Sequence, residues 1–413
     1  MRIAIEGCCH GSLDAIYARL EQIPPFEKPE LLIICGDFQS IRDKNDLKFM
    51  SVPDKYKQLG DFHRYYSGES VAPILTLFIG GNHEASNYLE EVKFGGFVAS
   101  NIYYLGRSGV VWYKGLRICG LSGIYNSNDW AKLPPDNFQF LNSSDSSSMN
   151  VNNNLKPFDD SGNLFINDWA VRKSYHTRKD DFIKLNLVSP DNKMVFVSHD
   201  WPEGIYNYGN VNQLTKFKPH FKKDIYRHEL GNPWSMQLMR NLKPNWWFSA
   251  HLHCKFEATI NWSTQKRVSP SGRALTDFKK TKVDSQEIPL DFSDSEEGIN
   301  KDEIELEIDS DADAGTEETL SKSAEAAITS NFLALDKCLP KRKFLEVMDL
   351  PLTDPNHESV NSNCLLYDKE FICIQRVYER NKAKIYHLKP HDLSNTYEPF
   401  KWPKEKYSDS QLY

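Results

Sequence analysis

Five short segments of the sequence place metal-binding side chains at the ends of apolar runs. In chain order they are Cys8-Cys9-His10, Gly36-Asp37, Gly81-Asn82-His83-Glu84, Ser198-His199-Asp200 and His251-Leu252-His253. A single histidine after an apolar strand is most often a buried core residue. A His-x-His pair on a strand is stronger evidence, because both rings lie on the same side. The presence of all five segments in one chain favours a metal centre.

The mixture of ligand types suits two neighbouring cations. One carboxylate, Asp37, can bridge both, while imidazoles and the amide oxygen of Asn82 complete the two coordination shells. Two cations about 3.5–4 Å apart activate water for in-line attack on phosphorus. This chemistry indicates a phosphoester hydrolase. A version in which a single cation activates the water stays open.

Strand-like runs position these residues. Apolar runs at 2–7, 31–38, 74–84, 193–201 and 246–253 lead into the five segments, and a further run spans 110–123. Residues 12–23 have helical spacing between two of these strands. Strands that alternate with helices predict a layered α/β domain, whose ligand site lies at the carboxyl ends of the strands.

Size and composition are those of a globular protein, which we expect to be intracellular. The 413 residues are 40% hydrophobic, which allows a catalytic domain with additions. No run approaches the roughly 18 apolar residues of a membrane span, and we expect no secretion signal. The eight cysteines are mostly isolated and form no C-x-x-C pair. We therefore expect reduced thiols rather than a disulfide framework or a zinc ribbon.

The ordered motifs D-x-H, G-D, G-N-H-[DE], H and G-H-x-H are the signature of the metallophosphoesterase superfamily, which residues 1–260 resemble. Here Cys8 stands where an aspartate is usual, and Ala250 stands in the last motif's glycine position. That cysteine makes the chain similar to the RNA lariat debranching enzymes over nearly its whole length, together with GDFQSIR (36–42), FIGGNHE (78–84), SHDWP (198–202), WWFSAHLH (246–253) and FLALDKCLP (332–340). The resemblance implies an α/β metallophosphoesterase β-sandwich flanked by helices, with a loop insertion and a C-terminal extension.

The resemblance also assigns roles to the residues of the five segments. One metal pocket would consist of Cys8, His10, Asp37 and His253. The other would consist of Asp37, Asn82, His199 and His251, so that Asp37 is shared. His83 matches the family's catalytic histidine, which lies near the leaving oxygen. Glu84 or Asp200 is a candidate to orient a histidine ligand.

The thiolate of Cys8 makes one pocket softer than a pocket with aspartate would be, which favours Fe²⁺ or Zn²⁺ over Mg²⁺. The resemblance likewise implies two divalent cations, iron or zinc, with Mn²⁺ able to substitute. A nearby dication would keep the Cys8 thiol deprotonated. The adjacent Cys9 is expected to be a small spacer turned away from the cations.

The expected activity is hydrolysis of the 2′,5′-phosphodiester at the branch point of excised intron lariats, in intron turnover and mRNA processing. The products are a linear RNA with a 5′-phosphate and a free 2′-hydroxyl, and His83 assists departure of the 2′-oxygen. Branched RNA is then the partner, the nucleus the expected location and a monomer the expected state.

Three alternative functions would use the same residues. A cysteine phosphatase with Cys8 as nucleophile is disfavoured because no C-x5-R follows. Another phosphoesterase of the superfamily, such as a DNA nuclease or a protein phosphatase, would keep aspartate at position 8. A non-catalytic scaffold on this fold would have lost ligands, whereas every expected position is filled.

The expected organisation is a catalytic domain at 1–260 with a lariat-recognition insertion at 125–180, a disordered Ser/acidic linker at 266–325, and a C-terminal extension at 326–413 that packs on the catalytic domain. Residues 291–318 contain thirteen acidic residues and one lysine, so the rest of the chain is mildly basic. A basic body is compatible with a polyanionic substrate.

The ends of the insertion contain aromatic residues that could stack on bases. The candidates for substrate binding are Tyr125, Trp130, Tyr175 and His176. The alternative is that these side chains only anchor the insertion to the domain. The resemblance favours RNA contact, while the unusually long Ser/Asn-rich centre at 141–154 departs from the family.

Overall fold

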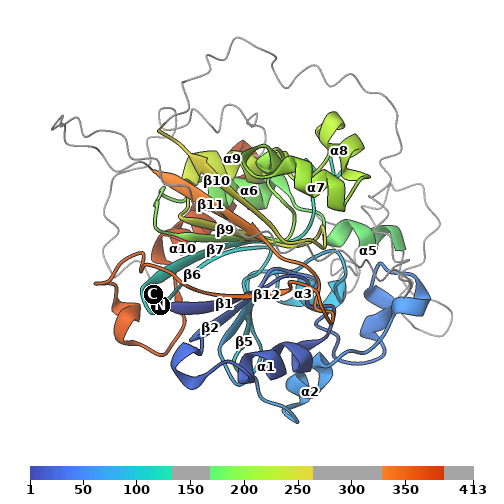
Figure 1. Ribbon diagram of the computed structural model, residues 1–413. Coiled ribbons are helices and arrows are strands. Elements are labelled where there is room, and N and C mark those ends of the chain that lie inside the picture. The colour runs from blue at the N-terminus through green and yellow to red at the C-terminus, as the bar shows by residue number, and fades with distance from the viewer. Residues whose placement is uncertain (133–167, 264–327, 386–413) are drawn as a thin grey trace, which may run out of the picture. The chain divides into compact units, whose positions relative to one another are not determined.

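The computed structural model describes residues 1–132, 168–263 and 328–385. Within these ranges a six-stranded and a seven-stranded sheet pack face to face, and helices cover their outer faces (Figure 1). This is the α/β sandwich expected from the sequence. The predicted linker at 266–325, the acidic residues 291–318 within it, and the Ser/Asn-rich centre of the insertion lie outside the described residues.

The first sheet has a parallel centre and antiparallel edges. Its order is β12 (Leu345–Asp349), β1 (Arg2–Glu6), β2 (Leu31–Ile34), β3 (Thr76–Phe78), β5 (Ile102–Tyr104) and β4 (Gly96–Ala99). The four strands β1, β2, β3 and β5 run parallel, while β12 and β4 run antiparallel to their neighbours. The carboxyl ends of β1, β2 and β3 therefore meet at one edge of the sheet.

The second sheet contains the remaining strands. Its order is β10 (Phe256–Asn261), β11 (Thr329–Ala334), β9 (Trp246–Ser249), β8 (Val195–Ser198), β7 (Leu116–Leu121), β6 (Ser108–Tyr113) and β13 (Leu366–Tyr367). The predicted run 110–123 is two strands rather than one. Lys114 and Gly115 both have positive φ there, which makes the tight turn between β6 and β7.

Three apolar layers hold the sandwich together. Between the sheets, Ile3 and Ile5 of β1 face residues such as Val195 and Val197 of β8. The intervening Ala4 points to the outer layer on α1, because successive side chains of a strand alternate. Both faces of the central strands are buried, which explains why these strands read as continuous apolar runs.

Helices cover the outer faces of the two sheets. The first sheet is covered by α1 (Leu13–Glu21), α2 (Phe62–Ser67) and α3 (Ser86–Glu91). The second is covered by α6 (Lys179–Asn186), α7 (Val211–Phe217), α8 (Phe221–Arg227), α9 (Pro233–Leu242) and α10 (Lys369–Ile385). The helix α5 (Asp168–Ser174) lies in the insertion, and short 3₁₀ turns occupy Pro25–Glu27, Asp46–Phe49, Asp54–Tyr56, Ile205–Tyr208 and Glu358–Asn361. The predicted helix at 12–23 is α1.

The segment after residue 328 is part of both sheets. The strand β11 lies between β9 and β10, and β12 pairs with β1 over residues 2–6. Arg117 of β7 binds Asp368 and Glu370 at the start of α10, with an Nε–Oδ2 distance of 2.8 Å to Asp368. The C-terminal residues thus complete the sandwich.

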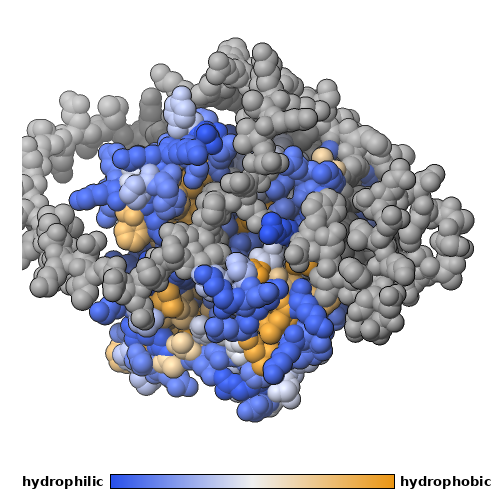
Figure 2. All heavy atoms as spheres, turned by 90° about the vertical axis from the view of Figure 1, so that its right-hand side faces the viewer, coloured by the Kyte–Doolittle hydropathy of each residue, from blue (hydrophilic) through white to orange (hydrophobic). Residues whose placement is uncertain are grey.

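Among the described helices, none has the length and apolar character needed to cross a bilayer. Figure 2 shows the side of the molecule at the right of Figure 1. Hydrophilic residues make up most of the described surface visible there, and hydrophobic residues gather in smaller patches.

Candidate metal centre

The predicted ligands lie in the loops that follow the strands β1, β2, β3, β8 and β9. Four of them have a left-handed backbone, with φ values of 46° at His10, 45° at Asp37, 64° at His251 and 49° at His253. This conformation is uncommon for residues other than glycine and tends to persist at functional sites. The sequence placed the His-x-His pair on a strand. That placement is wrong, because β9 ends at Ser249 and both histidines stand on the bend beyond it.

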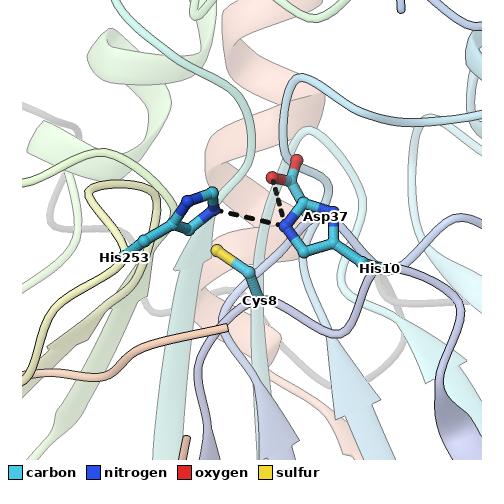
Figure 3. Close-up of side chains that lie close together, drawn as sticks. All are labelled: Cys8, His10, Asp37 and His253. Carbon is cyan, nitrogen blue, oxygen red and sulfur yellow. Dashed lines mark hydrogen bonds and ion pairs between the residues drawn. The ribbon is translucent and has the colours of Figure 1, made fainter. Parts of the chain in front are cut away.

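Four predicted ligands from three loops converge on one point. The nearest ligand atoms of Cys8, His10, Asp37 and His253 all lie within 4.8 Å of one another (Figure 3). The Nε2 atoms of His10 and His253 are 3.2 Å apart, and His10 Nε2 lies 3.8 Å from Asp37 Oδ2. The backbone amide of His251 donates to Cys8 Sγ at 3.2 Å, which holds the sulfur in place. Sulfur, imidazole and carboxylate groups at this spacing are a suitable set of ligands for a divalent metal ion.

The second predicted set adjoins the first through Asp37. His199 Nε2 lies 3.4 Å from Asp37 Oδ1 and 3.2 Å from the amide oxygen of Asn82. The ring of His251 lies 5.0 Å from that of His199, centroid to centroid. His199 Nδ1 donates to the carbonyl of Cys35 at 2.8 Å, so its Nε2 faces the site. This backbone bond fixes the ring as metal-binding histidines require.

The buried carboxylate of Asp37 fits a cation. Its side chain is fully buried, and Oδ2 accepts no hydrogen bond. Burial by itself raises the pKa of a carboxyl, yet His199, His83 and His10 hold the pKa of Asp37 well below its usual range. A buried, ionised carboxylate with an unoccupied oxygen is costly unless a positive charge binds it.

The other ligands of the Cys8 group are neutral without a cation. Burial lowers the pKa of His10 to about 4, so the ring is neutral at pH 7. Burial also raises the pKa of the Cys8 thiol well above its ordinary value, and the charge of Asp37 raises it further. A cation that binds this group must therefore displace the thiol proton.

Two glycines give the ligands room. A Cβ on Gly36, whose φ is 115°, would lie 2.2 Å from His199 Nδ1. A Cβ on Gly81 would lie 2.1 Å from Asp37 Oδ1 and 2.7 Å from His199 Nε2. All three distances are far inside van der Waals contact, so the site requires glycine at these positions.

Glu84 binds backbone amides of two ligand loops. Its buried carboxylate accepts from the amides of Phe38, Gln39 and Gly81 at 2.7, 2.9 and 3.0 Å. Phe38 and Gln39 follow Asp37, and Gly81 precedes Asn82. From the sequence, Glu84 was a candidate to orient a histidine ligand. In the structure its carboxylate instead accepts hydrogen bonds from the backbone of both loops and joins them.

Asp200 ties the insertion to the ligand His199. Its Oδ2 accepts from the amide of Tyr125 at 3.1 Å, and burial raises its pKa to about 6. The two ends of the insertion meet at Asp129, which binds His176 Nδ1 at 2.9 Å and, through its carbonyl, Arg178. The insertion therefore begins and ends beside the metal centre.

The four aromatic and histidine candidates for RNA contact are largely buried. Trp130 stacks on Trp234 with a centroid distance of 4.7 Å and belongs to the core under the second sheet. Tyr175 and His176 are also buried, while Tyr125 is half-buried. These contacts support the anchoring alternative, and RNA contact by these side chains stays a prediction.

His83 stands next to the metal ligands. Its ring centroid lies 5.2 Å from that of His10, and its backbone amide donates to Asp37 Oδ1 at 2.8 Å. Cys9, in contrast, packs with residues of α1 in the outer layer. The two adjacent cysteines therefore point into different parts of the molecule.

Lys337 lies near the site, and no role for it was predicted from the sequence. It pairs with Cys8 in an isolated β-bridge, and the amide of the next residue, Cys338, donates to the Cys8 carbonyl at 3.0 Å. Burial is the main cause of the lowered pKa values of His10 and His253. The positive charge of Lys337 makes a smaller contribution in the same direction. The sequence feature that could have indicated it is the charged pair Asp336-Lys337 shortly after β11 (Thr329–Ala334). The other site segments also follow the ends of strands.

Two family models match the chain. Residues 1–255 match the calcineurin-like phosphoesterases, which use divalent metal ions, and residues 327–409 match the C-terminal domain of lariat debranching enzymes. The second match includes the strands β11, β12 and β13 and the helix α10 described above.

Several relatives carry the name lariat debranching enzyme. The Saccharomyces cerevisiae protein is 39% identical over 92% of this chain and 85% of its own length, and the Schizosaccharomyces pombe protein is 37% identical over 91% and 78%. The Homo sapiens protein is 37% identical, and the chain spans 53% of its length. The chain therefore belongs to the lariat debranching enzyme family of calcineurin-like phosphoesterases, as the sequence predicted.

Proposed function

We propose that this chain hydrolyses the 2′,5′-phosphodiester bond at the branch point of excised intron lariat RNA. The products are a linear RNA with a 5′-phosphate and a free 2′-hydroxyl. The observation that carries the proposal is the buried Cys8 thiol, which takes the place of an aspartate beside His10, Asp37 and His253. The names of the similar debranching enzymes support the substrate class.

Two divalent cations fit the ligands at the strand ends. Cys8, His10 and His253 would hold one cation, and Asn82, His199 and His251 the other, with Asp37 shared by both. Bound there, the cations supply positive charge to the phosphoryl oxygens and activate water for attack on phosphorus. The left-handed backbone at His10, Asp37 and His253 accompanies the convergence of these side chains on one point.

The cations are Fe²⁺ or Zn²⁺, and Mn²⁺ can substitute. The Cys8 pocket combines sulfur with imidazole, the ligands of softer metals. The second pocket has oxygen and nitrogen ligands from Asp37, Asn82 and two histidines, which accept a wider range of ions. Mg²⁺, which prefers oxygen ligands, suits the Cys8 pocket poorly.

His83 is the acid of the reaction. Its ring lies beside the Cys8 group without belonging to it, and its backbone bond to Asp37 fixes the start of the side chain. From this position it donates a proton or a hydrogen bond to the departing 2′-oxygen. The proton transfer avoids release of an alkoxide.

The remaining features follow from the substrate. The insertion at 125–180 contacts the RNA near the branch, with Tyr125, Trp130, Tyr175 and His176 at its anchored ends. The catalytic domain comprises residues 1–260, and the extension from 326 completes it. A protein that processes excised introns acts in the nucleus, and we expect it to act as a monomer.

A substrate comparison tests the proposal. Purified protein is loaded with Fe²⁺, Zn²⁺ or Mn²⁺ and incubated with branched RNA, linear 3′,5′-RNA and a chromogenic phosphodiester. We expect the branched RNA to be cleaved and the linear RNA to survive. Equal cleavage of linear and branched RNA would show a general phosphodiesterase and overturn the proposal.

A further inference from the structure

The helices α7 and α8 form a basic surface with exposed aromatic rings. We call it the α7–α8 ridge, and its residues are Lys216, Phe217, Lys218, Lys222, Lys223, Tyr226 and Arg227. Phe217 is 58% exposed and Tyr226 is 87% exposed, although neither ring is needed to attach the helices. The attachment to the core is made by Leu214 and Phe221, which are buried. Two large, solvent-exposed aromatic rings surrounded by lysines are typical of an interaction surface.

The four lysines and one arginine of the ridge outnumber the acids beside them, which are Asp224 within α8 and Glu229 after it. Within the part of the chain that the structure describes, Lys216, Lys222 and Lys223 form no ion pair, and Arg227 approaches Glu229 only at 3.9 Å. The ammonium of Lys218 lies 5.6 Å from the centroid of the Phe217 ring, so a positive charge and an aromatic face lie side by side on this surface. The ridge thus offers cations and flat apolar faces to the same partner.

The ridge is fastened to loops of the metal centre. His228, just after α8, lies 3.2 Å from Glu203, which follows His199 in the chain by four residues. In Figure 1, α7 and α8 lie at the upper right of the molecule.

We propose that the α7–α8 ridge binds single-stranded RNA of the substrate outside the branch itself. The lysines contact phosphates, and Phe217 and Tyr226 stack on bases. This inference rests on the proposed function, because a lariat offers a continuous single strand on either side of the branch. A strand held here lies beside Glu203, four residues after His199.

The chemistry of the ridge favours RNA over the chain's own acidic segment at 291–318. That segment supplies negative charge but contains a single aromatic residue, Phe292. Single-stranded RNA presents both a phosphate and a base at every nucleotide, and base stacking tolerates any sequence. Of these two partners, RNA is the one that uses both the lysines and the two exposed rings.

The test measures binding and cleavage separately. Binding of a linear RNA of about 16 nucleotides, the upper end of single-strand site sizes, is followed by fluorescence anisotropy over a range of salt concentrations. The variants are Phe217→Ala with Tyr226→Ala, and Lys222→Gln with Lys223→Gln. The control is Phe26→Ala with Lys28→Gln, an equally exposed aromatic and lysine pair before β2.

Each ring removed should weaken RNA binding roughly fivefold or more. The lysine pair should reduce the slope of log affinity against log salt by about 1.4, since each phosphate contact on a single strand contributes about 0.7. The control should bind as the wild type does. Unchanged affinity and slope in both ridge variants would overturn the inference.

Cleavage separates this inference from the proposed function. Ridge variants should lose more activity on a branched RNA with long arms than on a minimal branched RNA, and the loss should be in KM. If the wild type cleaves neither RNA, the proposed function fails whatever the ridge binds. If the ridge variants cleave long-armed RNA faster than the wild type, the ridge holds the acidic segment and the RNA assignment is wrong.

Discussion

The carboxylate of Glu84 lies 2.7 Å from the backbone nitrogen of Phe38, and this hydrogen bond joins the loop after β3 to the loop after β2. One loop carries Asn82 and the other carries Asp37. Two more amides donate to the same carboxylate, and burial raises its pKa to about 7. Glu84 therefore positions ligands of both pockets without contributing a ligand atom to the Cys8 group.

Replacing Glu84 should lower the affinity of the site for metal ions more than it lowers the stability of the fold. We expect Glu84→Gln to reduce metal affinity by about 10–100-fold, because an amide cannot accept all three backbone bonds. Glu84→Ala should lose more. Metal titration against a competing chelator measures this, with the exposed Glu69→Gln as control. Unaltered metal affinity in Glu84→Ala would remove the positioning role.

Removing the His83 ring should separate chemistry from metal binding. His83→Ala should bind two cations per chain and lose at least about 100-fold in turnover, the lower end for a general acid. Elemental analysis and single-turnover cleavage of branched RNA report the two properties. Activity close to the wild type would mean that the 2′-oxygen leaves without this residue.

Cys8→Asp should change both the preferred metal and the pH dependence of its binding. Because burial raises the pKa of the Cys8 thiol, a cation must displace a proton, and affinity should rise up to about tenfold per pH unit between pH 6 and 8. Burial and the charge of Asp37 act on an aspartate at this position too, but its ordinary pKa of about 3.9 lies far below that of a thiol, so a cation displaces its proton more easily. Affinity of the variant should thus depend less steeply on pH and be shifted from Zn²⁺ toward Mg²⁺ and Mn²⁺. Identical pH profiles of metal binding would argue against a thiolate ligand.

Gly81→Ala should empty the centre by a steric effect. The added Cβ would meet Asp37 Oδ1 at 2.1 Å and displace the shared ligand. The neighbouring Gly80→Ala is the control, because its Cβ would meet the flexible end of Leu89 at 3.0 Å. Metal content should fall in the first variant and persist in the second. Full metal content in Gly81→Ala would show that the loops adapt.

The bond between Arg117 and Asp368 should stabilise the attachment of α10. Both side chains are buried, and Asp368 Oδ1 also accepts from the amide of Phe371 at 2.7 Å. Arg117→Met leaves a buried carboxylate without its cation, which typically costs about 3 kcal/mol or more in unfolding free energy. Urea unfolding measures the loss, and Arg2→Met at the exposed Asp349 pair should change little. Equal effects of the two variants would refute the assignment.

The sequence was sufficient to predict the fold and which loops meet. The carboxyl ends of β1, β2 and β3 share one edge of the first sheet, and those of β8 and β9 share one edge of the second, so the polar residues after them gather at these two edges. The face-to-face packing of the two sheets then brings the two groups together. Cys8 stood out because its neighbours matched a known order of motifs. The His-x-His pair was predicted to lie on a strand, whereas both histidines follow the end of β9 and have positive φ. Their backbone conformation depends on contacts outside the strand, which the apolar pattern does not indicate.

Long-range contacts could not be predicted from local patterns. Lys337 reaches Cys8 only because β11 inserts between β9 and β10, more than 300 residues along the chain from β1. From the sequence, Trp130 was a candidate either for RNA contact or for anchoring the insertion, and its stacking on Trp234 is visible only in the structure. Glu84 accepts amides 45 and 46 residues away, which no spacing rule within one loop would indicate.

The most direct test uses a single branched RNA whose adenosine carries both a 2′,5′ and a 3′,5′ linkage. Both bonds then compete for the same site in one molecule, and the products identify the bond that opened. Cleavage of the 2′,5′ bond alone is predicted, with a free 2′-hydroxyl on the adenosine and a 5′-phosphate on the released strand. Opening of the 3′,5′ bond at a comparable rate would contradict the account.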